Sequence, residues 1–145
     1  MVCVIMSTYN GEQYIRQQLA SILEQTYKGI QVLIRDDGSS DKTVEILHEY
    51  QSRYPNIQYY TGNNMGAAQS FYDLLKHVPM EADYIAFSDQ DDVWLEGKVK
   101  AATSDLIHEM NNDLEIEYKG YIIDLNDNQY ELPNLDDNSF NNETK

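Results

Sequence analysis

The stretch that decides the fold is residues 2–10, which read VCVIMSTYN. Its first five residues form an unbroken apolar run rich in β-branched side chains, which is typical of a strand buried on both faces. The polar residues that follow, together with Gly11, end the strand. Because strands of this kind occur in parallel sheets that helices cover on each side, the run predicts an α/β fold.

Strand-like and helix-like patterns alternate along the rest of the chain. Helical spacing of apolar residues occurs in residues 12–25, 41–54, 67–75 and 95–110, and strand patterns occur in residues 2–7, 31–35, 57–60, 84–87 and 117–125. The alternation predicts a Rossmann-like parallel sheet flanked by helices. We assign residues 1–125 to this domain and residues 126–145 to an acidic Asn/Asp-rich tail that has little to bury.

Polar clusters follow three of the predicted strands at the point where each strand ends. They are STYN at residues 7–10, DDGSSD at residues 36–41 and DQDD at residues 89–92. Ligands of open α/β sheets bind outside the carboxyl ends of the strands, near the point where the strand order reverses. The sequence therefore predicts that these clusters form one site at a single edge of the sheet.

Residues 89–92 place three carboxylates within four residues. Their mutual repulsion is costly unless a cation or water screens it, and oxygen ligands of this kind suit Mg²⁺ or Mn²⁺. The alternative interpretation is an acidic, solvated turn at the start of the next helix. The position at a strand end, with Trp94 directly after it, favours the metal site.

The Asp36–Asp37 pair also has two interpretations. Gly38 to Asp41 are typical of a turn and a helix cap, in which short polar side chains satisfy free backbone amides. Asp36 and Asp37 can instead accept hydrogen bonds from a nucleobase or a ribose. The turn at residues 63–66 is similar, and Asn64 is a further candidate ligand.

Composition excludes several classes of protein. Ten basic and 25 acidic residues give a formal net charge of −15 over 145 residues, which argues against a nucleic-acid partner or a polybasic grip on lipid. The single cysteine excludes an internal disulfide and a Cys-based zinc cluster, and Cys3 itself is expected in the core. Three histidines lack metal-ligand spacing, and no apolar run reaches the length of a transmembrane segment.

Four stretches in the right order resemble family 2 glycosyltransferases of the GT-A fold. They are VIMSTYNGE at residues 4–12, LIRDDGSSDKT at residues 33–43, NNMG at residues 63–66 and SDQDDVW at residues 88–94. The last stretch is most similar to bacterial rhamnosyltransferases that build cell-wall or capsular polysaccharide. The resemblance covers the N-terminal, donor-binding part of such enzymes.

The resemblance implies metal-dependent transfer of a sugar, such as rhamnose, from a dTDP- or UDP-sugar to a glycan or lipid-linked acceptor, with inversion. The residues that it implies for nucleotide-sugar binding are Ser7, Thr8, Tyr9, Asp36, Asp37, Asn64 and Asp89, and Asp91 is implied as the ligand of Mn²⁺ or Mg²⁺. We expect a cytoplasmic protein, or one peripheral at the inner face of the plasma membrane. An exposed apolar flank is expected to allow self-association.

No general base is assigned in this chain. Family members carry that Asp or Glu in a second half, after the metal-binding strand. Glu115, Glu117 and Asp124 are available carboxylates, but none lies in a matching motif. The alternative is therefore a donor-binding module without turnover. A phosphoacceptor signalling domain is disfavoured, because it needs its acidic pair after the first strand.

Overall fold

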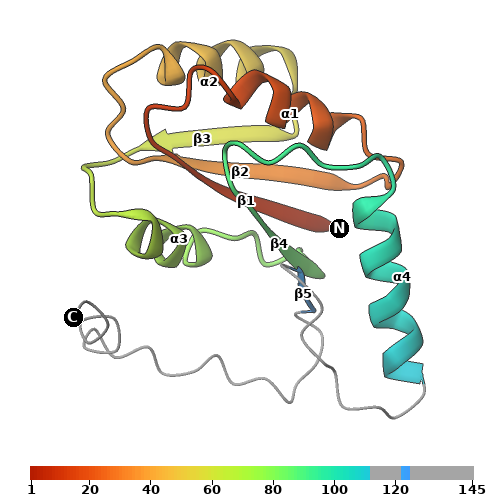
Figure 1. Cartoon of the computed structure of the whole chain (residues 1–145). Coiled ribbons are helices and arrows are strands. Elements are labelled where there is room, and N and C mark those ends of the chain that lie inside the picture. The colour runs from red at the N-terminus through yellow and green to blue at the C-terminus, as the bar shows by residue number, and fades with distance from the viewer. Residues whose placement is uncertain (112–121, 125–145) are drawn as a thin grey trace, which may run out of the picture.

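The computed structural model describes residues 1–111 and 122–124, in which five strands form one sheet in the order β3-β2-β1-β4-β5 (Figure 1). The strands are β1 (Val2–Thr8), β2 (Ile30–Asp36), β3 (Ile57–Thr61), β4 (Tyr84–Ser88) and β5 (Ile122–Asp124). The helices are α1 (Ile15–Leu23), α2 (Thr43–Arg53), α3 (Ala67–Leu75) and α4 (Lys98–Asn111). The predicted α/β class and alternation of elements are confirmed.

The central strand β1 explains why residues 2–6 are uniformly apolar. It pairs in parallel with β2 on one side and with β4 on the other, and all five of these residues are fully buried. Its alternate side chains enter two separate cores, because successive residues of a strand point to opposite faces. Val2, Val4 and Met6 pack on one face, while Cys3 and Ile5 pack on the other.

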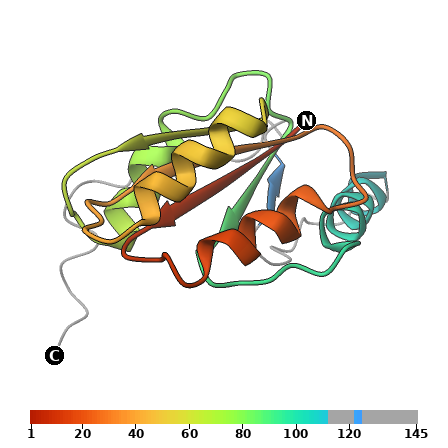
Figure 2. The same cartoon turned by 90° about the horizontal axis from the view of Figure 1, so that it is seen from above.

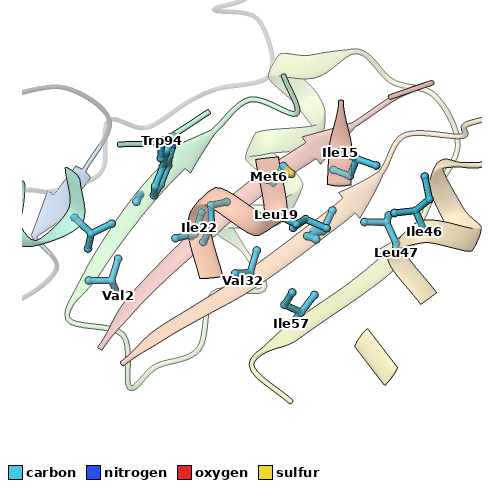
Figure 3. Packing of buried hydrophobic residues seen from close by; sticks show 14 residues of the cluster. Val2, Met6, Ile15, Leu19, Ile22, Val32, Ile46, Leu47, Ile57 and Trp94 are labelled. Carbon is cyan, nitrogen blue, oxygen red and sulfur yellow. The ribbon is translucent and has the colours of Figure 1, made fainter. Parts of the chain in front are cut away.

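The two faces of the sheet are covered by different helices. Helices α1 and α2 lie over the first face, where Leu19, Leu47 and Trp94 pack into the same cluster as Val2 (Figures 1 and 3). Helix α3 covers the other face, where Leu74 packs with Ile5. Seen from above, α1 and α2 run alongside the strands that they cover (Figure 2). This three-layer arrangement leaves the carboxyl ends of the parallel strands free of helix cover.

Strand β5 departs from the expected parallel sheet. It runs antiparallel to β4, and Asp124 pairs with Tyr84 at the amino end of that strand. Of the predicted strand at residues 117–125, residues 117–121 and residue 125 lie outside the described part of the chain, as does the predicted tail at 126–145. An edge strand of three residues carries too short a pattern for its direction to be read from sequence.

Two helices begin later than their sequence patterns suggest. Helix α1 starts at Ile15 rather than residue 12, and residues 12–14 form a turn in which the Glu12 carboxylate accepts a hydrogen bond from the Lys42 amide (2.9 Å). Helix α4 starts at Lys98 rather than residue 95. The expected contribution of Asp41 to the start of α2 is present, since its carboxylate accepts a hydrogen bond from the Thr43 amide (2.9 Å). Among the described helices, none has the length and apolar character needed to cross a membrane.

Cys3 offers a direct test of the buried position of β1. Burial raises the pKa of its thiol to about 11, so little reactive thiolate exists near neutral pH. We expect native protein to react with a thiol reagent far more slowly than free cysteine does, and unfolded protein to react at once. Because Cys3 is the single cysteine in the sequence, the readout is unambiguous. Rapid labelling of the native chain would contradict the central position of β1.

Candidate functional site

A pocket of about 430 Å³ opens at the carboxyl ends of β1, β2 and β4. Its walls come from the ends of these strands, from the loop between β3 and α3, and from the first turns of α3. The lining residues are Ser7, Tyr9, Asp37, Asn64, Gly66, Ala67, Phe71, Asp89, Gln90 and Asp91. Six of the eight predicted site residues are therefore brought together here, from segments up to 84 positions apart.

The other two predicted site residues, Thr8 and Asp36, are buried and do not line the pocket. The Thr8 hydroxyl donates to Asp36 Oδ1 (3.1 Å). The same carboxylate accepts hydrogen bonds from the amides of Gly38 (3.2 Å) and Ser39 (2.9 Å). In this structure both side chains shape the loop after β2. Gly38 has a φ of +84°, which suits glycine at this tight turn.

Asp37 lines the pocket although its side chain is almost fully buried. It forms an ion pair with the Arg35 guanidinium, with 2.5 Å between Nη1 and Oδ1. Its carboxylate also accepts hydrogen bonds from the amides of Met65 and Gly66, both at 2.9 Å. Asp37 therefore connects the end of β2 to the loop before α3. Sequence reasoning missed Arg35, because an arginine inside an apolar strand gives no signal of its partner.

Gln90 is a second residue that sequence reasoning missed. Its side-chain amide pairs with the Tyr9 backbone in both directions, accepting from the amide (2.9 Å) and donating to the carbonyl (3.1 Å). The acidic loop after β4 is thereby held against the end of β1. Tyr9 is 48% exposed, so part of this residue is accessible to a ligand. Nearby, the Ser7 hydroxyl donates to Ser70 on α3 (2.6 Å).

The acidic loop at residues 89–92 concentrates negative charge at one end of the pocket. Partial burial raises the pKa of Asp89, and the neighbouring charges of Asp92 and Asp91 raise it further. Both Asp89 and Asp91 line the pocket, whereas Asp92 faces adjacent surface. Within the described residues, no group of three or more His, Cys, Asp or Glu side chains converges on one point.

Two carboxylates of the pocket nevertheless suit a divalent cation that prefers oxygen ligands and binds together with phosphates. Mg²⁺ is commonly held by one or two carboxylates together with phosphates of the substrate, and Mn²⁺ favours the same oxygen ligands. Asp89 and Asp91 meet that description. The pKa of Asp89 is raised first by partial burial and then by the charges of Asp92 and Asp91, and a cation would relieve that repulsion. The donor set therefore suits Mg²⁺ or Mn²⁺ that binds together with an anionic ligand.

The strand order 3-2-1-4-5 reverses direction between β1 and β4, and the pocket lies beside that reversal. Ligands of open α/β sheets bind at this switch point, so the polar pocket lies where a ligand site is expected in this class of domain. Residues 3–112 match the model of Glycosyl transferase family 2. The chain belongs to this family, as the sequence motifs predicted.

Two curated relatives illustrate the similarity. The chain is 46% identical over 106 residues to the dTDP-rhamnosyl transferase RfbG of Shigella flexneri. That alignment covers 70% of this chain and 37% of the relative. The chain is 34% identical over 130 residues to WfgD of Escherichia coli, a UDP-Glc:alpha-D-GlcNAc-diphosphoundecaprenol beta-1,3-glucosyltransferase, which covers 88% of this chain and 48% of the relative. The chain thus spans between a third and a half of their length.

Solved structures agree with the fold. S. aureus TarS 1-349 in complex with UDP-GlcNAc superposes with a TM-score of 0.68 at 27% identity, covering 75% of this chain and 32% of that one. The mannosyltransferase PcManGT from Pyrobaculum calidifontis, in complex with GDP-Man and Mn²⁺, has a TM-score of 0.59 at 26% identity. This superposition covers 64% of this chain and 28% of the mannosyltransferase. The predicted Rossmann-like GT-A architecture is confirmed.

The contrast between Asp36 and Asp91 is testable by equilibrium unfolding. Asp36→Asn keeps the size of a buried side chain but turns an amide donor toward backbone N–H groups, so we expect a loss of about 1–3 kcal/mol of stability. Asp91→Asn alters an exposed loop side chain and is expected to stay within about 0.5 kcal/mol of wild type. Equal stability of the two variants in urea titrations would refute the structural role of Asp36.

Proposed function

We propose that this chain is the donor-binding part of a glycosyltransferase that takes a nucleotide diphosphate sugar. The observation that carries the proposal is one pocket that joins a fixed carboxylate, Asp37, to the acidic pair Asp89 and Asp91. The first end suits a nucleoside and the second suits a metal-bound diphosphate. The similarity to a dTDP-rhamnosyl transferase supports a dTDP-deoxysugar such as dTDP-rhamnose as donor, with a UDP-sugar as the other candidate.

At the nucleoside end, Ser7, Tyr9 and Asn64 surround Asp37. The half-exposed Tyr9 ring offers an apolar face to a base or sugar, and Asp37 offers an acceptor for an N–H or O–H group. Thr8 and Asp36 support these groups from beneath through the loop after β2. The proposed nucleotide-sugar site thus contains all seven predicted residues, with five in the pocket wall and two below it.

At the diphosphate end, Asp91 is the proposed metal ligand and Asp89 faces the ribose and diphosphate. A divalent cation bound here would neutralise the charge that builds on the departing diphosphate. The chain has a net charge of −15, so a cation between the acidic loop and the phosphates also removes the repulsion that would oppose binding. Metal dependence and inversion at the transferred sugar are parts of this proposal.

The acceptor, by similarity a glycan or a lipid-linked sugar, would complete the reaction in polysaccharide or cell-wall synthesis. A lipid-linked acceptor would bring the otherwise cytoplasmic protein to the inner face of the plasma membrane. Val93 and Leu95, which precede α4 and are 54% and 83% exposed, are candidates for the expected apolar flank. Self-association through this flank remains a prediction.

A second candidate function is donor binding without turnover. The backbone of residue 124 pairs with Tyr84 at the amino end of β4, whereas the pocket lies at the carboxyl end of that strand, so β5 does not bring residue 124 to the edge of the sheet where the pocket lies. Glu115 and Glu117 lie outside the described residues. Incubation with dTDP-rhamnose distinguishes the two functions: release of dTDP indicates turnover, and retention of intact donor identifies a binding module.

Asp91→Ala tests the metal end of the site. We expect the variant to keep the thermal stability of wild type and to lose the increase in dTDP and UDP affinity that Mn²⁺ produces. Isothermal titration with and without Mn²⁺ measures the effect, and Glu81→Ala, which removes an exposed carboxylate that does not line the pocket, serves as the control. An unchanged Mn²⁺ effect would remove Asp91 from the site.

Asp37→Ala tests the nucleoside end. We expect about a tenfold or larger loss of nucleotide affinity both with and without Mn²⁺, because the lost contact is independent of the phosphates. Circular dichroism of the variant checks that the fold is retained. Affinity equal to that of wild type in a folded variant would exclude Asp37 from nucleoside recognition.

A further inference from the structure

The guanidinium of Arg35 lies beneath the pocket and does not line it. Its side chain is 2% exposed, and its nitrogens contact Asp37 Oδ1 (2.5 Å), Ser70 Oγ (3.1 Å), the Asn63 carbonyl (3.0 Å) and Asp73 Oδ2 (3.3 Å). A charge this deeply buried persists only where partners surround it. Here two carboxylates and two neutral acceptors surround the guanidinium, and these contacts fix its orientation.

The hydrogen bonds of Asp37 leave little of its carboxylate unused. An ionised carboxylate offers about four acceptor positions. Oδ1 accepts from Arg35 and from the Met65 amide, and Oδ2 accepts from the Gly66 amide. One position on Oδ2 remains, and Asp37 is part of the pocket wall. The pocket therefore presents a single oriented acceptor at this point.

The loop that carries Asn64 depends on the same arginine. Arg35 donates to the Asn63 carbonyl, and a side chain at Gly62 would collide with the guanidinium. Gly66 has a φ of +86°, which lets the loop turn into α3 while its amide reaches Asp37. The position of this wall of the pocket is thus set by contacts with the Arg35–Asp37 pair.

Behind Arg35, a second carboxylate is held in place on the side away from Asp37. The Tyr60 hydroxyl donates to Asp73 Oδ2 (2.9 Å), and burial together with that bond raises the pKa of Tyr60. Asp73 does not line the pocket, so its contact with Arg35 serves only the network. The Arg35 guanidinium is therefore held by two carboxylates, those of Asp37 and Asp73.

We propose that Arg35 is a positioning residue for nucleobase selection, acting through Asp37. Arg35 and the Met65 amide occupy Oδ1, and the Gly66 amide occupies one position of Oδ2. The one acceptor position that remains suits a base with a ring N–H such as uracil or thymine. Cytosine in the same pose places a ring nitrogen lone pair against that oxygen. The inference rests on the proposed function, since it assumes that the base lies against Asp37.

Titration of UDP and CDP in the presence of Mn²⁺ tests the proposal, because the two ligands differ only in the base. We expect wild-type protein to bind UDP at least about tenfold more tightly than CDP.

Arg35→Lys keeps the charge but lacks the planar fork of donors, so it should lower the ratio of UDP affinity to CDP affinity by about threefold or more. Loss of overall stability alone would weaken both ligands and keep the ratio. Arg16→Lys, at an exposed ion pair with Glu49, is the matched control and should leave the ratio unchanged.

A measurement on the wild-type chain covers the case in which Arg35→Lys does not fold. The sequence contains three arginines, so side-chain NMR signals of Arg35 are distinguishable from those of Arg16 and Arg53. Saturating UDP should shift the Arg35 guanidinium signals more than CDP does and leave the other two in place.

The outcomes separate the two levels of the proposal. Failure of both nucleotides to bind overturns the proposed function and this inference with it. Equal affinities for UDP and CDP overturn the inference alone. An unchanged ratio in folded Arg35→Lys, or Arg35 signals that do not respond to UDP, likewise overturns the role of Arg35 and leaves nucleotide binding standing.

Discussion

Two adjacent buried carboxylates at the end of β2 organise the edge of the sheet on which the rest of the site depends. Neighbouring residues of a strand point to opposite faces, so Asp36 and Asp37 serve different loops. Asp36 binds Thr8 and the amides that follow β2, while Asp37 binds Arg35 and the amides before α3. Because a buried carboxylate is stable only where hydrogen-bond donors surround it, these bonds hold each loop in one conformation.

The site that results has two ends with different electrostatics. Around Asp37, negative charge is offset by Arg35 and by backbone amides, so a neutral nucleoside meets no strong repulsion. Around Asp89 and Asp91, no ion pair offsets the negative charge within the described part of the chain, and the pKa of Asp89 is raised by burial and by the neighbouring carboxylates. This asymmetry fits a ligand that is neutral at one end and carries a metal-bound diphosphate at the other. It also assigns separate tasks to acidic residues that composition alone treats as equivalent.

The sequence was sufficient to predict the fold and most residues that line the candidate pocket, because apolar runs identify buried strands and parallel strands bring their carboxyl ends to one edge. It did not distinguish Asp36 from Asp37, since their roles follow from which face each side chain occupies. Gln90 and Ser70 were missed because their partners, the Tyr9 backbone and the Ser7 hydroxyl, lie far away along the chain. The antiparallel direction of β5 could not be predicted either, because the pattern of a three-residue edge strand is too short to indicate the direction of pairing.

The central claim is that a metal-bound nucleotide occupies the pocket between Asp37 and Asp91. Paramagnetic broadening by Mn²⁺ in NMR spectra of the isotope-labelled chain, recorded with and without dTDP, tests it most directly. The account predicts that Mn²⁺ with dTDP broadens the amide signals of residues 7–9 and 89–92 and spares those at the end of α2, near Arg53. Broadening elsewhere, or no effect of dTDP on the Mn²⁺ response, would contradict it.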